Sequence, residues 1–127
     1  MGVTNEAGAA TWTELVTGDT KAAEAFYTGL FGWQAKLQPM ETMVYTVFRR
    51  GETQAAGMMP KPKEMGEAPP SWLTYFGVED CEKTVQRASG LGARVLAPTM
   101  TLPRVGSFAV LMDPQGAVFG LLQPGRS

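Results

Sequence analysis

The fold of this chain is decided by residues 12–33, WTELVTGDTKAAEAFYTGLFGW. The β-branched and apolar residues at 11–17 predict a strand. Asp19 follows as a suitable N-cap for a helix over 21–30, because its carboxylate can accept hydrogen bonds from the free N–H groups of the first turn. A second strand is predicted over 33–37. The predicted helix carries apolar residues at three- and four-residue spacing, which indicates one buried stripe made of Ala22, Ala23, Phe26, Tyr27 and Leu30.

The plan of this stretch returns later in the chain. Asp19 lies ten residues before Gly29, and Asp80 lies ten residues before Gly90. This shared offset indicates an internal duplication into two β-α-β-β-β modules. The remaining elements are predicted as strands at 43–49 and 53–59, an exposed proline-rich connection at 60–70, a strand at 71–78, a helix at 81–89, strands at 93–97 and 99–102, and a hairpin of 107–112 with 117–123.

The same pattern predicts the domain organisation. We expect residues 1–10 to form a loose lead-in and residues 11–124 to form a single domain. Module one would occupy 11–59 and module two 71–124, on either side of the connection.

Composition excludes several classes of function. The 127 residues carry 11 basic and 12 acidic side chains mixed along the chain, so no basic block predicts nucleic-acid binding. No apolar run approaches the roughly 20 residues that span a bilayer, so no membrane contact is expected. The single cysteine, Cys81, cannot form an intrachain disulfide, and a cytoplasmic protein is predicted. The chain contains no histidine, which removes the commonest metal ligand and general base.

Several short motifs carry a likeness to a known family. They are Asp19, Phe26-Tyr27 and LFGW at 30–33 in module one, with Trp72, Tyr75, Pro98 and DPQGA at 113–117 in module two. With them the chain resembles the vicinal oxygen chelate superfamily, which includes glyoxalase I, extradiol dioxygenases and bleomycin or fosfomycin resistance proteins. It is most similar to the glyoxalase-like proteins with a WxELxTxD motif.

The resemblance implies both a fold and an assembly. The fold would be α+β, with two paired β-α-β-β-β modules that form curled, cup-like mixed sheets and carry their helices outside. It also implies a two-fold homodimer.

The resemblance further implies where a metal ion would be bound. The first ligand, commonly His, stands seven residues before the aspartate that opens the helix, and this position is Trp12. The matching position in module two is Leu73, and the last ligand, commonly Glu, would stand at Gly120. Indole, isobutyl and hydrogen cannot bind a divalent cation, so we expect neither a metal ion nor another cofactor.

Strand alternation predicts what fills the cup instead. Trp12 and Glu14 share one face of the first strand, and Leu73 and Tyr75 share the equivalent face in module two. Gly120 would face the cup from the last strand. The cup is then mostly apolar and aromatic, which is typical of a small-molecule pocket, and these five residues are the candidate ligand-binding set.

Each candidate also has a simpler interpretation. Glu14 is the candidate catalytic residue, a desolvated carboxylate able to move a proton, but it could equally be a structural carboxylate paired with Arg49 or Arg104, or one facing solvent. Trp12 and Tyr75 could stack on a planar ligand or could only fill space. Cys81 has no histidine partner and is expected to be a non-functional thiol.

Two functions follow from these residues. The first is metal-independent binding of a small, partly apolar or aromatic molecule in the cup between the modules. The alternative is a glyoxalase-like lyase or isomerase with Glu14 as acid/base. A family member whose role does not involve the cup is a third interpretation.

Overall fold

A computed structural model describes residues 7–102 and 106–125 of the chain. Its elements follow the predicted order strand, helix, three strands, twice over. Module one contains β1 (Ala10–Thr17), α1 (Thr20–Phe31), β2 (Gln34–Pro39), β3 (Val44–Arg50) and β4 (Thr53–Pro60). Module two contains β5 (Ser71–Gly77), α2 (Cys81–Gly90), β6 (Arg94–Leu102), β7 (Gly106–Met112) and β8 (Val118–Pro124). The short 3-10 helix η1 (Lys63–Met65) lies between the modules in sequence.

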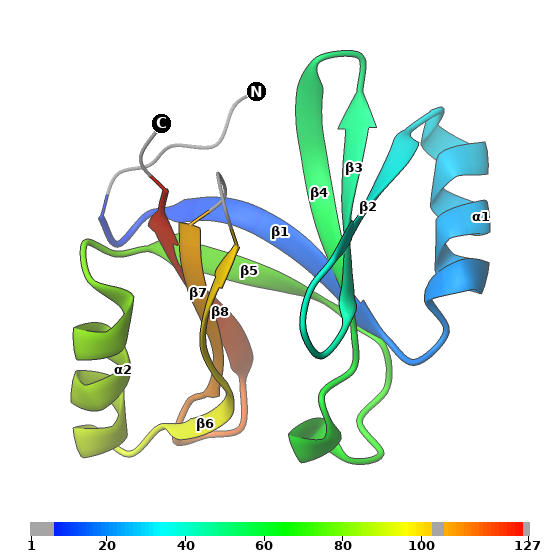
Figure 1. The fold of residues 1–127 in the computed structure, drawn as a ribbon. Helices are drawn as coiled ribbons and strands as arrows, with labels where there is room; N and C mark the ends of the chain where they lie inside the picture. Colours follow the sequence, from blue (N-terminus) through cyan, green and yellow to red (C-terminus); the bar gives the residue numbers. More distant parts are fainter. Residues whose placement is uncertain (1–6, 103–105, 126–127) are drawn as a thin grey trace. The chain divides into compact units, whose positions relative to one another are not determined.

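The contacts of the chain divide it into two compact units. The first-module unit is residues 13–72, and the second-module unit is residues 1–12 with 73–127. In each unit one helix lies against a sheet of mixed strands (Figure 1). The fold is therefore α+β with two β-α-β-β-β modules and curled mixed sheets, as predicted. The boundaries expected for the lead-in, modules and connection stay predictions.

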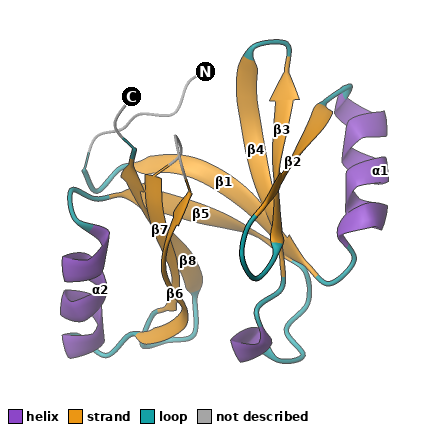
Figure 2. Ribbon diagram, viewed as in Figure 1, coloured by secondary structure: helices purple, strands orange, loops and turns teal. Residues whose placement is uncertain are grey.

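The sheet of the first-module unit has the order β2-β3-β4-β1. Its β2–β3 and β3–β4 pairs are antiparallel, and β1 pairs with β4 in parallel (Figure 2). One face of this sheet packs against α1 through a cluster of buried side chains. The cluster joins Leu15, Phe48, Ala56 and Met58 to the partly buried Ala23, Tyr27, Trp33 and Ala35.

The sheet of the second-module unit has the order β5-β8-β7-β6. Again the long hairpins are antiparallel, and β5 pairs with β8 in parallel. Cys81 of α2 is buried with Ala109, Leu111 and Leu121 of the sheet. Val85 and Ala88, on the inner face of this helix, pack against this cluster.

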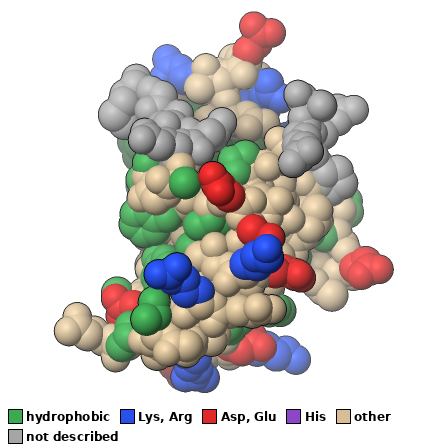
Figure 3. Space-filling model, turned by 90° about the vertical axis from the view of Figure 1, so that its left-hand side faces the viewer, with side chains coloured by type: hydrophobic (Ala, Val, Ile, Leu, Met, Phe, Trp, Pro, Cys, Tyr) green, Lys and Arg blue, Asp and Glu red, His purple; other side chains and the backbone are tan. Residues whose placement is uncertain are grey.

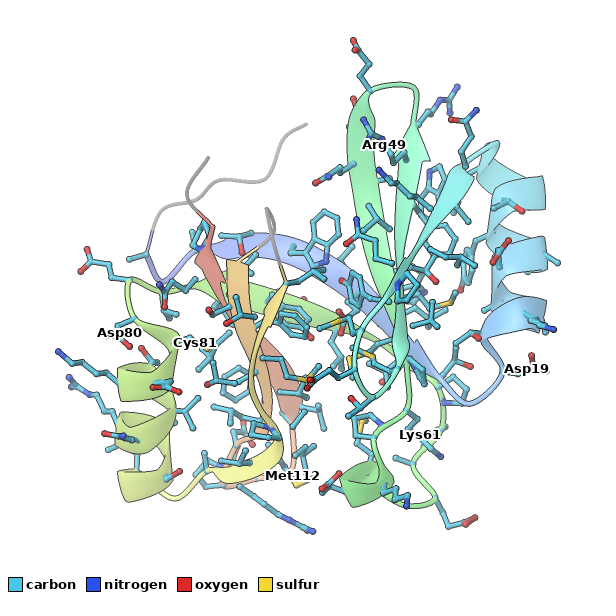
Figure 4. All side chains as sticks on the ribbon, viewed as in Figure 1. Asp19, Arg49, Lys61, Asp80, Cys81 and Met112 are labelled. Carbon is cyan, nitrogen blue, oxygen red and sulfur yellow. The ribbon has the colours of Figure 1, made fainter. Side chains whose placement is uncertain are left out.

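Both helices begin at the aspartates that define the repeat (Figure 4). Asp19 accepts a hydrogen bond at Oδ1 from the Ala22 N–H at 3.0 Å, and Asp80 accepts one at Oδ1 from the Lys83 N–H at 3.0 Å. At the end of α1, Gly32 adopts a left-handed conformation with φ 70°, in which its N–H donates to the Thr28 carbonyl. The caps therefore fix the same starting position for the helix in each module.

The apolar stripe predicted on α1 is wrong in part. Ala23 and Tyr27 pack toward the sheet, whereas Phe26 and Leu30 have 60% and 58% of their surface exposed. Ala22 is also exposed. Five apolar residues at this spacing cover a wider arc of the helix than the sheet of the unit contacts, so three of the five face away from it.

Two details of the later chain also differ from expectation. The strands predicted at 93–97 and 99–102 form the single strand β6, whose pairing shifts register on both sides of Ala97. Pro98 has no backbone N–H to donate, which agrees with an irregular ladder there rather than a break. The connection expected to be exposed and without an element contains η1, in which Met65 is buried. No helix among the described residues has the length and apolar character needed to cross a membrane.

Candidate functional site

Four of the five candidate ligand-binding residues belong to the second-module unit. The start of β1 is held beside β5 by backbone hydrogen bonds from Gly8 N–H to Gly77 O at 2.7 Å and from Gly77 N–H to Ala9 O at 2.8 Å. The Thr11 hydroxyl adds a bond to the Tyr75 carbonyl at 3.4 Å. These contacts fix the strand that carries Trp12, which is partly buried.

Tyr75 and Gly120 are brought together by the parallel pairing of β5 and β8. The two residues are direct partners in the register. A Cβ atom built on Gly120 would lie 2.6 Å from Cγ of Tyr75 and closer still to Cδ2 and Cε2. The Tyr75 ring therefore occupies the space that a side chain at position 120 would need.

The ring of Tyr75 is part of a buried aromatic contact on the same sheet. Tyr75 has 1% of its surface exposed, and its ring meets that of Phe108 edge-on, with 6.3 Å between the centroids. Leu73 is also buried. Because Leu121 packs with α2 and alternates with Gly120, Gly120 faces away from this helix. Tyr75, Gly120 and Phe108 thus lie on the sheet face opposite α2.

Glu14 is the fifth candidate and belongs to the first-module unit. It has 1% of its surface exposed and pairs in register with Gly57 on β4, which in turn pairs with Val47 on β3. Leu15, its neighbour on β1, packs with the cluster under α1. Glu14 therefore lies on the sheet face opposite α1, as the alternation predicted.

Of the two arginines expected as possible partners of Glu14, the structure describes only Arg49. Arg49 is partly buried near the β3–β4 turn, where its Nη2 donates to the Glu52 carbonyl at 3.3 Å. Arg104 lies outside the described residues. The interpretation of Glu14 as facing solvent is wrong, because the side chain is buried.

The residues at the implied metal positions do not fit a metal ion. Trp12, Leu73 and Gly120 offer no nitrogen, oxygen or sulfur ligand of the kind that divalent cations bind. At position 120 the Tyr75 ring also leaves no room for a carboxylate side chain. Within residues 7–102 and 106–125, no group of three or more His, Cys, Asp or Glu side chains is placed to hold a metal ion.

Cys81 is fully buried at the first turn of α2. Its N–H donates to Oε1 of Gln123 at 2.9 Å, and the Thr99 hydroxyl lies 3.7 Å from its Sγ. Burial raises the pKa of the Cys81 thiol, the Thr99 hydrogen bond lowers it by less, and the Asp80 and Glu82 charges raise it further. A neutral, inaccessible thiol is poorly suited to nucleophilic chemistry.

A shallow groove of about 490 Å³, which the sequence did not predict, lies beside the first turns of α2. Asp80, Lys83 and Arg87 contribute to its wall, and both acidic and basic side chains gather on the face of the molecule shown in Figure 3. Because charges of both signs line the groove, it has no clear preference for an anion or a cation.

Comparisons with known proteins agree on one family. A family model described as the Glyoxalase/Bleomycin resistance protein/Dioxygenase superfamily matches residues 9–121. A Mycobacterium tuberculosis protein named "Putative glyoxylase CFP32" is 37% identical over 121 residues, which cover 94% of this chain and 46% of the relative. The anthracycline biosynthesis protein DnrV of Streptomyces peucetius is 35% identical over 121 residues, which cover 95% of this chain and 43% of the relative. The chain thus spans about half the length of these relatives.

Solved structures share the fold at low sequence identity. A methylmalonyl-CoA epimerase from Streptomyces coelicolor, solved with 2-nitronate-propionyl-CoA, superposes with a TM-score of 0.64 and 14% identity. The superposition covers 95% of this chain and 100% of the epimerase chain. At such identity the likeness concerns the fold alone.

Proposed function

Because the chain belongs to the glyoxalase/bleomycin resistance protein/dioxygenase superfamily, we propose that it binds a small, partly apolar or aromatic molecule without using a metal ion. The observation that carries this proposal is the position of the Tyr75 ring over Gly120. An aromatic side chain stands where the resemblance implies a metal-binding carboxylate. An apolar surface therefore takes the place of the charged group that the resemblance implies at position 120.

The other implied metal positions support the same proposal. Trp12 and Leu73 present an indole and an aliphatic side chain instead of imidazole. Trp12 is only partly buried, so its indole keeps surface on which a planar molecule could stack. Apolar and aromatic side chains with a few polar groups are the usual lining of small-molecule sites.

The names of relatives suggest a first ligand to test. DnrV is named for anthracycline biosynthesis, and anthracyclines are planar, polycyclic aromatic molecules of the class that the proposal requires. An anthracycline is therefore the first probe for this chain. The expected homodimer and cytoplasmic location stay part of this proposal.

Glu14 favours a second candidate function, a glyoxalase-like lyase or isomerase. A carboxylate with 1% of its surface exposed is removed from water, and desolvation is one way in which proteins adapt carboxylates for proton transfer. In this function Glu14 would remove a proton from the substrate and return it to another atom. CFP32 carries a glyoxylase name, which agrees with this alternative.

Two measurements test the binding proposal. Metal analysis of protein purified without chelator should find far less than one equivalent of zinc, nickel, manganese or iron per chain. Titration with an anthracycline should quench tryptophan fluorescence, and Trp12→Phe should remove most of the quenching while Trp33→Phe should not. Stoichiometric metal would overturn the proposal, and so would quenching that is the same in both variants.

Glu14→Gln separates the two functions. The substitution keeps the size of the side chain but removes its ability to accept a proton as a base. If Glu14→Gln abolishes turnover but keeps the ligand affinity of the wild type, the protein is an enzyme that uses Glu14. If the variant and the wild type treat the bound ligand in the same way, binding alone is favoured. Turnover would be followed as exchange of a substrate C–H proton with deuterated water.

A further inference from the structure

The sheet of the first-module unit ends at β2, which among the described strands has a neighbour on one side only (Figure 2). Its pairing with β3 runs from Gln34 to Pro39 without a shift of register. β6, the end strand of the other unit, contains Pro98 and two register shifts, which are features that keep a further strand from pairing. β2 is therefore the regular edge of the two.

The hairpin turn after β2 shows which of its backbone groups point outward. The Met40 N–H donates to the Met43 carbonyl at 2.7 Å, and these two residues continue the β2–β3 register. Hydrogen-bonded pairs alternate along an antiparallel ladder, so Lys36 also bonds to β3, whereas the N–H and C=O groups of Ala35 and Leu37 point away from it. Within residues 7–102 and 106–125, these outward groups make no hydrogen bond.

The side chains at this edge add an uncovered apolar strip. Ala35 packs in the cluster under α1, so Leu37 and Pro39 lie on the same face by alternation. Val44 pairs with Pro39 and shares that face. Leu37 has 56% and Val44 has 44% of its surface exposed. The outward backbone groups and the apolar strip are thus both available to a further strand.

The same strand of a second copy fits this edge in antiparallel pairing. With a two-fold axis at Leu37, this residue faces its counterpart, and each exchanges N–H and C=O groups with the other. Each Ala35 N–H then meets the Pro39 carbonyl of the second copy, so the N–H that proline lacks removes one hydrogen bond there and not the pairing. The two Leu37 side chains cover each other on the α1 face.

Charge selects this register over the neighbouring one. An axis at Lys36 would place Lys36 opposite itself, and like charges directly opposite destabilise a pair of strands. With the axis at Leu37, Lys36 stands opposite Gln38 of the second copy, and a glutamine oxygen accepts hydrogen bonds from an ammonium group. β2 is therefore complementary to itself in the register centred on Leu37.

We propose that β2 is the contact through which two copies of this chain pair, in antiparallel register about Leu37. The homodimer expected with the proposed function has no assigned contact, and this inference rests on that expectation and supplies one. Pairing joins the first-module sheets of the two copies across the axis. Each copy has one such edge, so the assembly closes at two copies.

Sedimentation equilibrium of the full chain tests the pairing between about 1 μM and 1 mM, a range suited to a small interface. The wild type should move from the mass of one chain to twice that mass. Leu37→Lys places two ammonium groups opposite each other and should raise the dissociation constant about 10-fold or more. Leu91→Lys, at a side chain with 72% exposure in the other unit, should leave it unchanged. A single-chain mass over the whole range would overturn the proposal.

Cysteine cross-linking tests the register. The Cα atoms of a hydrogen-bonded antiparallel pair lie about 5.5 Å apart, within the range of a disulfide. Leu37→Cys should therefore give a covalent dimer under oxidised glutathione, whereas Lys36→Cys, opposite Gln38, should link far less. Cys81 does not compete because it is buried. A dimer that Leu37→Lys leaves intact and Leu37→Cys does not link would refute this inference, and would leave the expected homodimer and ligand binding standing.

Hydrogen exchange of the wild type supplies an internal control. The outward amides of Ala35 and Leu37 should exchange more slowly at high than at low protein concentration. The amides of Lys36 and Gln38 donate to β3 in both conditions and should change little. If circular dichroism shows that Leu37→Lys does not fold, this measurement carries the test with the cross-link. Exchange of Ala35 and Leu37 that is equal at both concentrations would contradict pairing through β2.

Discussion

The ring of Tyr75 lies directly over the backbone of Gly120, in the space where any other residue at position 120 would place its Cβ atom. The contact crosses the parallel pair β5–β8 and lies on the face away from α2. The two residues stand out in the sequence for separate reasons. Gly120 stands at an implied metal-ligand position, and Tyr75 is an aromatic residue with a polar hydroxyl. The absence of a side chain at position 120 is what allows the Tyr75 ring to lie there.

Gly120→Ala should therefore destabilise the protein. The added methyl group meets ring atoms that are held in a buried aromatic contact, and overpacking of this kind typically costs about 1–3 kcal/mol. Chemical denaturation followed by circular dichroism measures the change in the free energy of unfolding. Gly29→Ala is the matched control, because no atom lies within 4 Å of its added Cβ, and it should stabilise α1 by about 0.5–1 kcal/mol.

A second substitution shows whether the ring is the cause. In a Tyr75→Ala background none of the clashing ring atoms remains, so Gly120→Ala should cost clearly less than it does alone. Equal costs in both backgrounds would show that the Tyr75 ring is not what excludes a side chain at position 120.

Tyr27 and Trp72 should show a measurable energetic coupling. The Trp72 Nε1–H donates to the Tyr27 hydroxyl at 3.0 Å, and the two rings meet edge-on at 5.1 Å. Tyr27→Phe removes the acceptor and Trp72→Phe removes the donor, and both keep a ring. A double-mutant cycle should give a coupling of about 0.5–1.5 kcal/mol, toward the lower end because Trp72 is exposed. Strict additivity of the two substitutions would contradict a contribution from this bond.

Cys81 should react slowly with thiol reagents in the folded protein. The side chain is fully buried, and burial raises the pKa of its thiol, so little accessible thiolate forms near neutral pH. Reaction with a chromogenic disulfide at pH 8 should become fast only when denaturant opens the structure. Thr99→Val removes the hydrogen bond that lowers this pKa and should slow the reaction further. Rapid, complete labelling of the folded chain would contradict both expectations.

Local signals explain why most of the fold could be predicted from the sequence. The side chains of Asp19 and Asp80 cap the helices that begin after them, as the sequence predicted. The turn that begins at Asp113 joins β7 to β8, also as predicted. These features depend on residues a few positions apart. Burial of the stripe on α1 could not be predicted in the same way, because Phe26 and Leu30 are as apolar as Tyr27 and only packing decides which side faces the sheet.

The candidate site was predictable only in part for a related reason. Alternation placed Glu14, Tyr75 and Gly120 on the correct faces of their strands. It did not give the contact of Tyr75 with Gly120, which depends on the register between strands far apart in sequence.

Asp113 should make a pH-dependent contribution to stability through the turn that it begins. Its Oδ1 accepts hydrogen bonds from the N–H groups of Gln115 and Ala117, each at 2.9 Å. The bond from Ala117, followed by that from Gln115, lowers the pKa of Asp113 below its ordinary value of 3.8. Because the folded-state pKa is lowered, the contribution is fully present above pH 3.8 and is lost as the pH falls through the lower folded-state value.

Asp113→Asn tests this sign, because asparagine keeps an acceptor oxygen but does not ionise. The wild type should be more stable than Asp113→Asn at neutral pH, and the difference should shrink as the pH falls below 3.8. Glu52→Gln, in the turn between β3 and β4, controls for the general effect of removing one acidic charge. A carboxyl ¹³C titration should place the Asp113 midpoint below 3.8, since both bonds favour the ionised form. A midpoint at or above that value, or a stability difference that does not change with pH, would show that the two N–H groups do not select the carboxylate.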